Sequence, residues 1–287
     1  MRWSRGSDKG NVEDMRGQSG GPRFGGGGGA RLGVGGMLLL LVLSVVFKRD
    51  FFQLVGADGG VAAGAPAGEP LSPAAQAHED SLADLATFVF DTTQATWQQV
   101  LGAKYRDAKL VLFRESYPSA CGTAESAVGP FYCPGDQKVY IDLGFYDELE
   151  QRFGAPGDFA QAYVLAHELG HHVQNLLGIE RQMREAQQRN PEQANELSVR
   201  LELQADCFAG VWGHDAAQEG VLQTGDVEEG LRAAAAVGDD RLQKMATGRV
   251  NPDGFTHGTA EQRSRWFNEG LRSGDPNRCD TFGAARL

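Results

Sequence analysis

His167, Glu168 and His171 follow the spacing His-Glu-x-x-His within the segment Val-Leu-Ala-His-Glu-Leu-Gly-His-His-Val at 164–173. Residues four apart in a helix lie on one face, so both imidazoles can reach one metal ion while the carboxylate points to an open position on it. This pattern is typical of zinc hydrolases, in which the glutamate is the general base. We therefore expect a helix that carries a catalytic zinc site. The alternative is an amphipathic helix with two incidental histidines.

Two glycines fit this interpretation. Gly178 follows the motif and the uncharged residues after it, at the position expected for a helix C-cap. Gly170 lies inside the helix, where glycine costs about 1 kcal/mol relative to alanine. Close approach of another backbone near the metal would explain its presence there.

Glu202 and Asp206 are the candidates for the rest of the site, since a catalytic zinc needs a third protein ligand and leaves its fourth position to water. They lie one turn apart in a predicted helix whose apolar neighbours place both near the core. An isolated carboxylate is costly there unless it meets a cation. We expect Glu202 to bind the zinc and Asp206 to accept the free ring N–H of a ligating histidine. The alternative is ion pairing of both carboxylates with nearby arginines on a solvated face.

Other zinc patterns do not match the chain. The extended motif with a third histidine requires Gly at 174 and His at 177, where this sequence has Gln and Leu. The inverted motif HxxEH and the Cys-x-x-Cys spacing of a structural zinc site do not occur.

The motifs described above, together with Thr256-His-Gly-Thr-Ala-Glu-Gln-Arg263, resemble the bacterial putative neutral zinc metallopeptidase family. The resemblance covers roughly residues 80–275 and includes the segments at 129–134 and 139–143. It implies a zincin-like fold with His167, His171 and Glu202 as metal ligands and Glu168 as the catalytic carboxylate. Proteins of this family have one N-terminal membrane segment.

The N-terminal part of the chain differs in composition from the rest. Residues 1–31 are rich in Gly and Arg and predict a disordered tail, and the almost wholly apolar stretch 32–47 predicts a transmembrane helix. The Gly, Ala and Pro-rich residues 48–75 read as a flexible linker. We assign residues 76–287 to the catalytic domain. A cleaved signal peptide and a buried core helix are the alternatives for 32–47.

Charge indicates an orientation for this segment. Six Lys or Arg residues precede it, whereas residues 50–103 contain none. The positive-inside rule then predicts a single-pass protein of the bacterial cell membrane with a cytoplasmic N-terminus and a periplasmic or extracellular catalytic domain. Residues 1–49 hold eight Lys or Arg and three Asp or Glu, so of the total net charge of −11 the remainder of the chain carries −16. This acidic part argues against a nucleic-acid partner.

The four cysteines fit an oxidising compartment, because all follow the apolar stretch and their number is even. Of the three possible pairings we favour Cys121 with Cys133, which closes a Gly/Pro-containing loop, and Cys207 with Cys279, which ties the C-terminus to the helix of Glu202. Free buried thiols are the alternative.

The expected fold is α+β and mostly helical, with a small antiparallel sheet beside the motif helix. Helices are predicted at 79–101, 226–237 and 239–246, and strands at 109–114 and 138–143. Thr259 to Gln262 form a capping-box pattern that opens a final helix. His257 lies just before it, where it could donate to an oxyanion or simply be a surface residue.

These features predict a membrane-anchored zinc peptidase that cleaves peptide or protein substrates with a water activated by Zn²⁺ and Glu168. The alternative is a non-catalytic envelope binding or scaffold protein stabilised by zinc. The intact Glu168 favours the enzyme, since a structural zinc has no use for that carboxylate.

Overall fold

The computed structural model describes residues 1–4, 10–17, 71–126 and 129–287. The expected transmembrane helix at 32–47 lies outside these residues, as does most of the expected linker. Among the described residues, none of the helices combines the length and the apolar character that a bilayer crossing requires.

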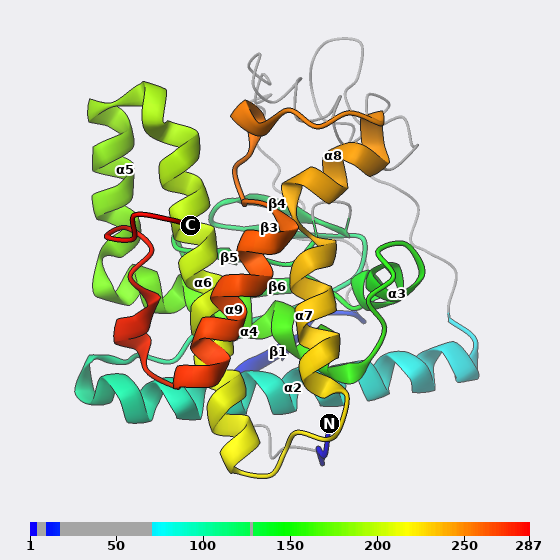
Figure 1. The fold of residues 1–287 in the computed structure, drawn as a ribbon. Helices are drawn as coiled ribbons and strands as arrows, with labels where there is room; N and C mark the ends of the chain where they lie inside the picture. The colour runs from blue at the N-terminus through cyan, green and yellow to red at the C-terminus, as the bar shows by residue number, and fades with distance from the viewer. Residues whose placement is uncertain (5–9, 18–70, 127–128) are drawn as a thin grey trace, which may run out of the picture.

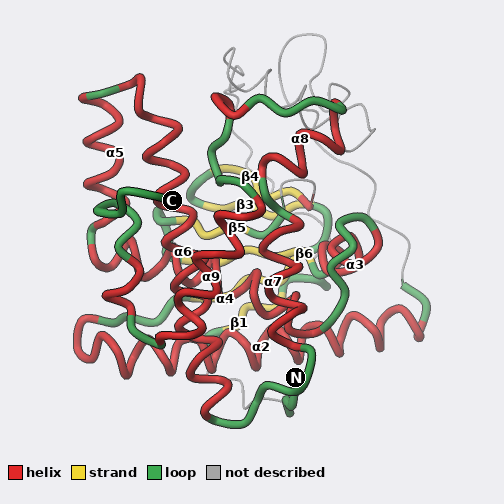
Figure 2. Tube along the Cα trace, in the orientation of Figure 1, coloured by secondary structure: helices red, strands yellow, loops and turns green. Residues whose placement is uncertain are grey.

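Helices make up most of this part of the chain, as Figure 2 shows. The long helices are α2 (Pro73–Leu101), α4 (Asp158–Leu177), α6 (Ala194–Gln218) and α9 (Ala260–Ser273). Shorter helices are α3 (Gly144–Gln151), α5 (Ile179–Arg189), α7 (Asp226–Ala236) and α8 (Asp239–Thr247). The predicted helices and strands are therefore present, although α2 begins at Pro73, inside the expected linker, where Ser72 caps it.

The α+β class is correct, but the main sheet is mixed rather than antiparallel. Its strands are β1 (Val12–Asp14), β2 (Lys109–Phe113), β6 (Lys138–Asp142) and β5 (Phe131–Cys133), in that spatial order. Pairing is parallel between β1, β2 and β6 and antiparallel only between β6 and β5. The chain leaves β2 through the hairpin of β3 (Ser116–Ser119) and β4 (Gly122–Glu125) and returns along β5, which is antiparallel to β6, so β6 can run in the direction of β2.

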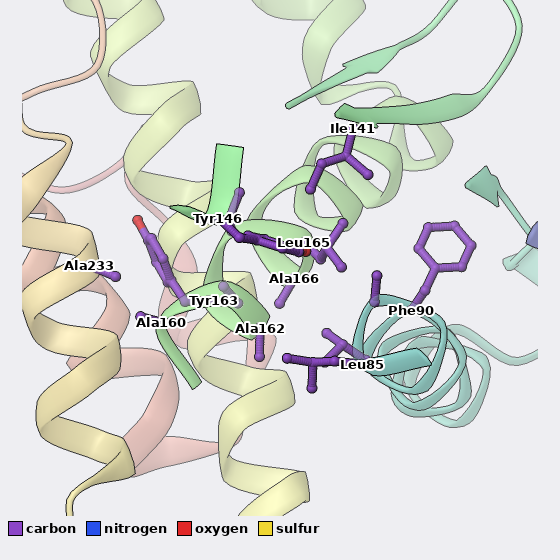
Figure 3. Packing of buried hydrophobic residues seen from close by; sticks show 14 of the residues in the cluster. Leu85, Phe90, Ile141, Tyr146, Ala160, Ala162, Tyr163, Leu165, Ala166 and Ala233 are labelled. Carbon is purple, nitrogen blue, oxygen red and sulfur yellow. The ribbon is translucent and has the colours of Figure 1, made fainter. Parts of the chain in front are cut away.

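Helix α4 is the central element of the core. It contacts α2, α6 and α7 as well as strands β5 and β6 (Figure 1). Figure 3 shows Leu165 on the side of Leu85 and Ile141, whereas Tyr163 lies toward Ala233 of α7. Burial on several faces explains why the helix is nearly free of charge outside the motif.

Both predicted disulfides are formed. Cys121 pairs with Cys133, which links the turn between β3 and β4 to β5, and Cys207 pairs with Cys279, which links α6 to the turn after α9.

The N-terminal residues contradict the expectation of a disordered tail where the structure describes them. Strand β1 pairs with β2, with Val12 opposite Leu110 and Asp14 opposite Leu112. Glu13 forms an ion pair with Lys138 across the sheet at 2.7 Å, and Arg16 bonds to Glu79 at 3.2 Å. The sequence hides this strand because it is short and polar and becomes stable only when β2 supplies its hydrogen-bond partners.

This pairing bears on the expected membrane orientation, which stays a prediction. A single crossing between residues 17 and 71 would put β1 and β2 on opposite sides of the bilayer, where they could not share a sheet. The side of the membrane on which each of the two strands lies therefore tests the expectation of a cytoplasmic N-terminus and an external catalytic domain.

We predict that residues 10–17 and 71–287 lie on the same side of the cell membrane. Gly17 and Lys104 are exposed, a side chain at 17 has free space, and the four native cysteines are all in disulfides. Gly17→Cys and Lys104→Cys should therefore react alike with a membrane-impermeant maleimide, either both on intact cells or both only after lysis. Labelling of only one of them on intact cells would contradict the β1–β2 pairing.

Candidate metal centre

The motif residues project from the buried middle of α4. His167 and Glu168 are 6% and 8% exposed, and the rings of His167 and His171 meet edge to face with centroids 4.8 Å apart. The helix ends at Gly178 in the left-handed conformation, as the sequence predicts. The local helical repeat thus brings both imidazoles to one side.

Helix α6 brings the third candidate ligand to the same point. A Cβ atom added to Gly170 would lie 3.0 Å from the carbonyl oxygen of Ala205 and 3.1 Å from its Cα. The expected close approach of another backbone is thus present, and that backbone is α6. Glu202 and Asp206 lie on either side of Ala205 along the helix, so this approach carries both carboxylates to the histidines.

Distances among the three side chains fit a zinc ion. The Nε2 atom of His167 is 3.2 Å from Glu202 Oε2, and the Nε2 atom of His171 is 3.6 Å from Glu202 Oε1. Ligand atoms of all three lie within 4.8 Å of one another. Ligands bound tetrahedrally at about 2.0–2.1 Å are separated by about 3.3 Å, so a small inward movement would complete the coordination.

Electrostatics also favour a cation here. Burial lowers the pKa of His171, but the Glu202 carboxylate outweighs burial and raises that pKa to about 10. Burial raises the pKa of Glu202, but His171 and His257 reverse this and hold it well below its ordinary value. The point where the two Nε2 atoms converge is therefore one at which the protein stabilises positive charge.

The Nδ1 atoms of both histidines are occupied. Nδ1 of His167 lies 2.8 Å from Asp206, in the role expected for that carboxylate, and Nδ1 of His171 lies 2.9 Å from the amide oxygen of Gln174. An N–H at each Nδ1 can donate to these acceptors, which leaves the Nε2 lone pairs for a metal.

Asp206 belongs to a wholly buried ionic network. Arg263 of α9 donates to both of its oxygens at 2.9 Å, and the Tyr163 hydroxyl donates to it as well. Burial raises the pKa of Asp206, but Arg263 and His167 together lower it by a larger amount. The net pKa of Asp206 therefore lies below its ordinary value. The carboxylate stays ionised because the arginine meets the charge that burial would otherwise penalise.

Glu168 is oriented separately from the three candidate ligands. Burial raises its pKa, the two histidines lower it, and the main-chain N–H of Tyr132 donates to its carboxylate. The net pKa is above the ordinary value, which suits a carboxylate that takes up a proton during a reaction.

His257 lies in the loop before α9, half-exposed, with its ring 3.2 Å from Asp239. Burial lowers the pKa of His257, but Glu202 and Asp239 outweigh burial and raise it. The main chain around it is held by Asp239, which accepts the N–H groups of 256, 257 and 258.

A cavity of about 1050 Å³ opens onto these groups. Its polar wall contains the three candidate ligands, Glu168, His257 and Arg263. Its apolar wall is formed by Phe131, Tyr132, Phe145, Phe153, Val164 and Leu242. The cavity is large enough for several residues of a peptide.

Sequence reasoning missed three members of this centre: Arg263, Tyr163 and Gln174. Tyr163 and Gln174 lie on the motif helix, and helical spacing places Gln174 one turn beyond His171. For Arg263 the only signal was the demand of a buried Asp206 for a cation, and that demand does not identify which arginine supplies it.

Comparisons with known proteins found a family model and several relatives. The family model described as putative neutral zinc metallopeptidase matches residues 1–282. The chain is 51% identical over 292 residues to the uncharacterized protein YpfJ of Escherichia coli (strain K12), covering 99% of both chains. It is 47% identical over 208 residues to the uncharacterized protein Rv2575 of Mycobacterium tuberculosis (strain ATCC 25618 / H37Rv), covering 69% of both. No solved structure matches the chain.

We predict that Asp206→Asn weakens zinc binding by about 10- to 100-fold, because the amide cannot both accept from His167 and neutralise Arg263. Competition with a chromophoric chelator measures the affinity. Asp215→Asn is the matched control, since Asp215 lies on the same helix and accepts from Thr96 at 2.6 Å without lining the cavity.

Removing one partner of a buried ion pair costs about 3–5 kcal/mol of folding free energy, so Asp206→Asn is first checked for folding. Tyr163→Phe deletes one hydrogen bond to the same carboxylate and leaves the charges intact. It should weaken zinc binding less but in the same direction. Unchanged zinc affinity in both folded variants would contradict the role given to Asp206.

Proposed function

The chain belongs to the putative neutral zinc metallopeptidase family, and from this premise we propose that it hydrolyses peptide bonds at the centre formed by His167, His171 and Glu202. The arrangement that we propose is zincin-like, with two ligands on the motif helix and the third on the helix packed against it. Zn²⁺ is the proposed cofactor, because two imidazoles and one carboxylate are ligands that it accepts readily.

One observation carries the proposal. Glu168 lies beside the converging ligand atoms, faces the cavity, and is not one of the three residues whose ligand atoms converge. A zinc that only stabilised the fold would be closed by a fourth protein ligand and would not need this carboxylate. The combination favours an enzyme over a zinc-stabilised binding or scaffold protein.

Glu168 is the proposed general base. Zinc bound at this site would lower the pKa of a water toward ~7 and polarise the scissile carbonyl. The Glu168 carboxylate takes the proton of the attacking water and then delivers it to the departing amine. The raised pKa of Glu168 supports this double role, because the group must be able to hold a proton between the two transfers.

His257 is the proposed donor to the oxyanion that forms on the carbonyl. Its raised pKa keeps the ring protonated over a wider pH range, and Asp239 fixes the ring at the cavity. A positioned cationic donor stabilises the negative charge that develops in the transition state.

Strand β5 is the proposed docking site for the substrate backbone. It is an edge strand of the main sheet, its residues Phe131 and Tyr132 line the cavity, and Tyr132 bonds to Glu168 through its main chain. An extended peptide that adds to this edge would bring a peptide bond past Glu168.

We also propose that residues 10–17 and 71–287 lie together in the oxidising space outside the cytoplasm. Both disulfides support this location, since cytosolic thiols are kept reduced. Attachment to the membrane through residues 32–47 rests on the apolar sequence of that stretch alone.

Glu168→Gln is expected to keep zinc and to lose about 10²- to 10⁴-fold in kcat. Elemental analysis measures the metal, and digestion of casein and of a peptide library with and without a chelator measures turnover. Glu185→Gln, on the exposed face of α5, is the control and should behave as the wild type. Full activity of a zinc-loaded Glu168→Gln protein would rule out the general-base role.

His257→Ala is expected to lower kcat by about 10²-fold with little change in zinc affinity, since only an oxyanion donor is removed. His78→Ala is a matched control, because His78 is also a half-exposed histidine paired with an aspartate, at 3.1 Å from Asp147, and it does not line the cavity. A loss of zinc in His257→Ala, or an unchanged kcat, would contradict the assignment.

A further inference from the structure

His172 stands directly after the second motif histidine but takes no part in the metal centre. Its side chain is completely buried and does not line the cavity. Nε2 lies 2.6 Å from the carbonyl oxygen of Arg106, and Nδ1 lies 3.0 Å from the hydroxyl of Tyr132. Both ring nitrogens are occupied by protein groups, so His172 is not a spare metal ligand.

The protons in this cluster can be assigned from geometry. A carbonyl oxygen only accepts, so Nε2 of His172 carries the proton that it donates to Arg106. Asn175 donates its side-chain N–H to the Tyr132 hydroxyl oxygen at 2.9 Å. The hydroxyl proton of Tyr132 is therefore free to go to Nδ1 of His172. The phenol is held by two residues of α4 at once.

Tyr132 connects this cluster to the reacting groups. It is the middle residue of β5, opposite Val139 of β6, and it lines the same cavity as Glu168. Among the strands that the structure describes, β5 has a neighbour on only one side, so the sheet alone fixes it weakly. The side chain of Tyr132 anchors the strand to α4, the helix that carries Glu168.

We propose that His172 and Asn175 are positioning residues that hold the edge strand β5 against Glu168 through the hydroxyl of Tyr132. This inference rests on the proposed peptidase function and adds a second use of the motif helix. One face of α4 supplies the metal ligands, and the adjoining face fixes the strand along which the substrate backbone would lie. Positions 172 and 175, which follow the motif on the same helix, would then matter for alignment and not for metal binding.

The test compares Tyr132→Phe with Tyr140→Phe in the full-length protein. Each variant deletes one hydroxyl from neighbouring strands, but the Tyr140 hydroxyl bonds to Asp136 at 2.7 Å and does not reach α4. Tyr132→Phe should raise the deuterium uptake rate of peptides covering residues 129–135 by about tenfold, the effect of losing one or two hydrogen bonds. Zinc affinity should not change, and kcat should fall by about 10- to 100-fold through misalignment.

His172 is tested in the same way. His172→Gln retains a donor for Arg106 and an acceptor for Tyr132, so it should recover part of the slow deuterium uptake that His172→Ala loses. Unchanged deuterium uptake at 129–135 in Tyr132→Phe would overturn the proposal, and so would a reduced zinc affinity of that variant. If the wild-type protein cleaves peptides, an unchanged kcat in Tyr132→Phe would also overturn it. If the wild-type protein binds zinc but cleaves no peptide, the peptidase function fails, while uptake and zinc affinity still decide whether His172 positions β5.

Discussion

The close crossing of α4 and α6 at Gly170 is the constraint on which the rest of the centre depends. With hydrogen in place of a side chain at 170, the backbone of Ala205 packs directly against the motif helix. Even a methyl group at 170 would require a shift of a few tenths of an ångström, and a longer side chain would push apart the helices that carry the two imidazoles and the carboxylates of Glu202 and Asp206. The roughly 1 kcal/mol that glycine costs in a helix is small beside the loss of a buried ionic centre.

Burial of two carboxylates then determines what surrounds them. Asp206 has Arg263, Tyr163 and His167 as partners, so its charge is compensated within the protein. Within the described part of the chain, Glu202 contacts the two histidines and, at longer range, His257, and the structure stabilises positive charge beside it. Two acidic residues one turn apart thus have different roles, because α9 delivers an arginine to one of them and not to the other.

The arginine reaches Asp206 through a second close helix crossing. A Cβ atom at Gly270 would lie 1.9 Å from the carbonyl oxygen of Cys207, and one at Gly210 would lie 2.1 Å from that of Phe267. The disulfide from Cys207 to Cys279 ties the residues after α9 to the same helix. Helix α6 is therefore held by α4 on one side and by α9 on the other, and the centre lies near both crossings.

The sequence by itself determined those features that depend on short spacing. The helical repeat puts His167 and His171 on one face and places Asp206 one turn after Glu202. A glycine at 178 ends α4. The motif, the candidate ligands and this helix boundary could therefore be predicted from residues close together in the sequence. Apart from the predicted disulfides and the predicted contact of Asp206 with a motif histidine, the tertiary structure decided which distant segments meet. The parallel pairing of β1 with β2, Arg263 on Asp206, and the anchoring of Tyr132 by His172 join residues from 40 to 98 positions apart, and nothing local in the chain encodes such partners. Their physical cause is the demand of buried polar groups and strand edges for hydrogen-bond partners, and only the packed fold determines which residues meet it.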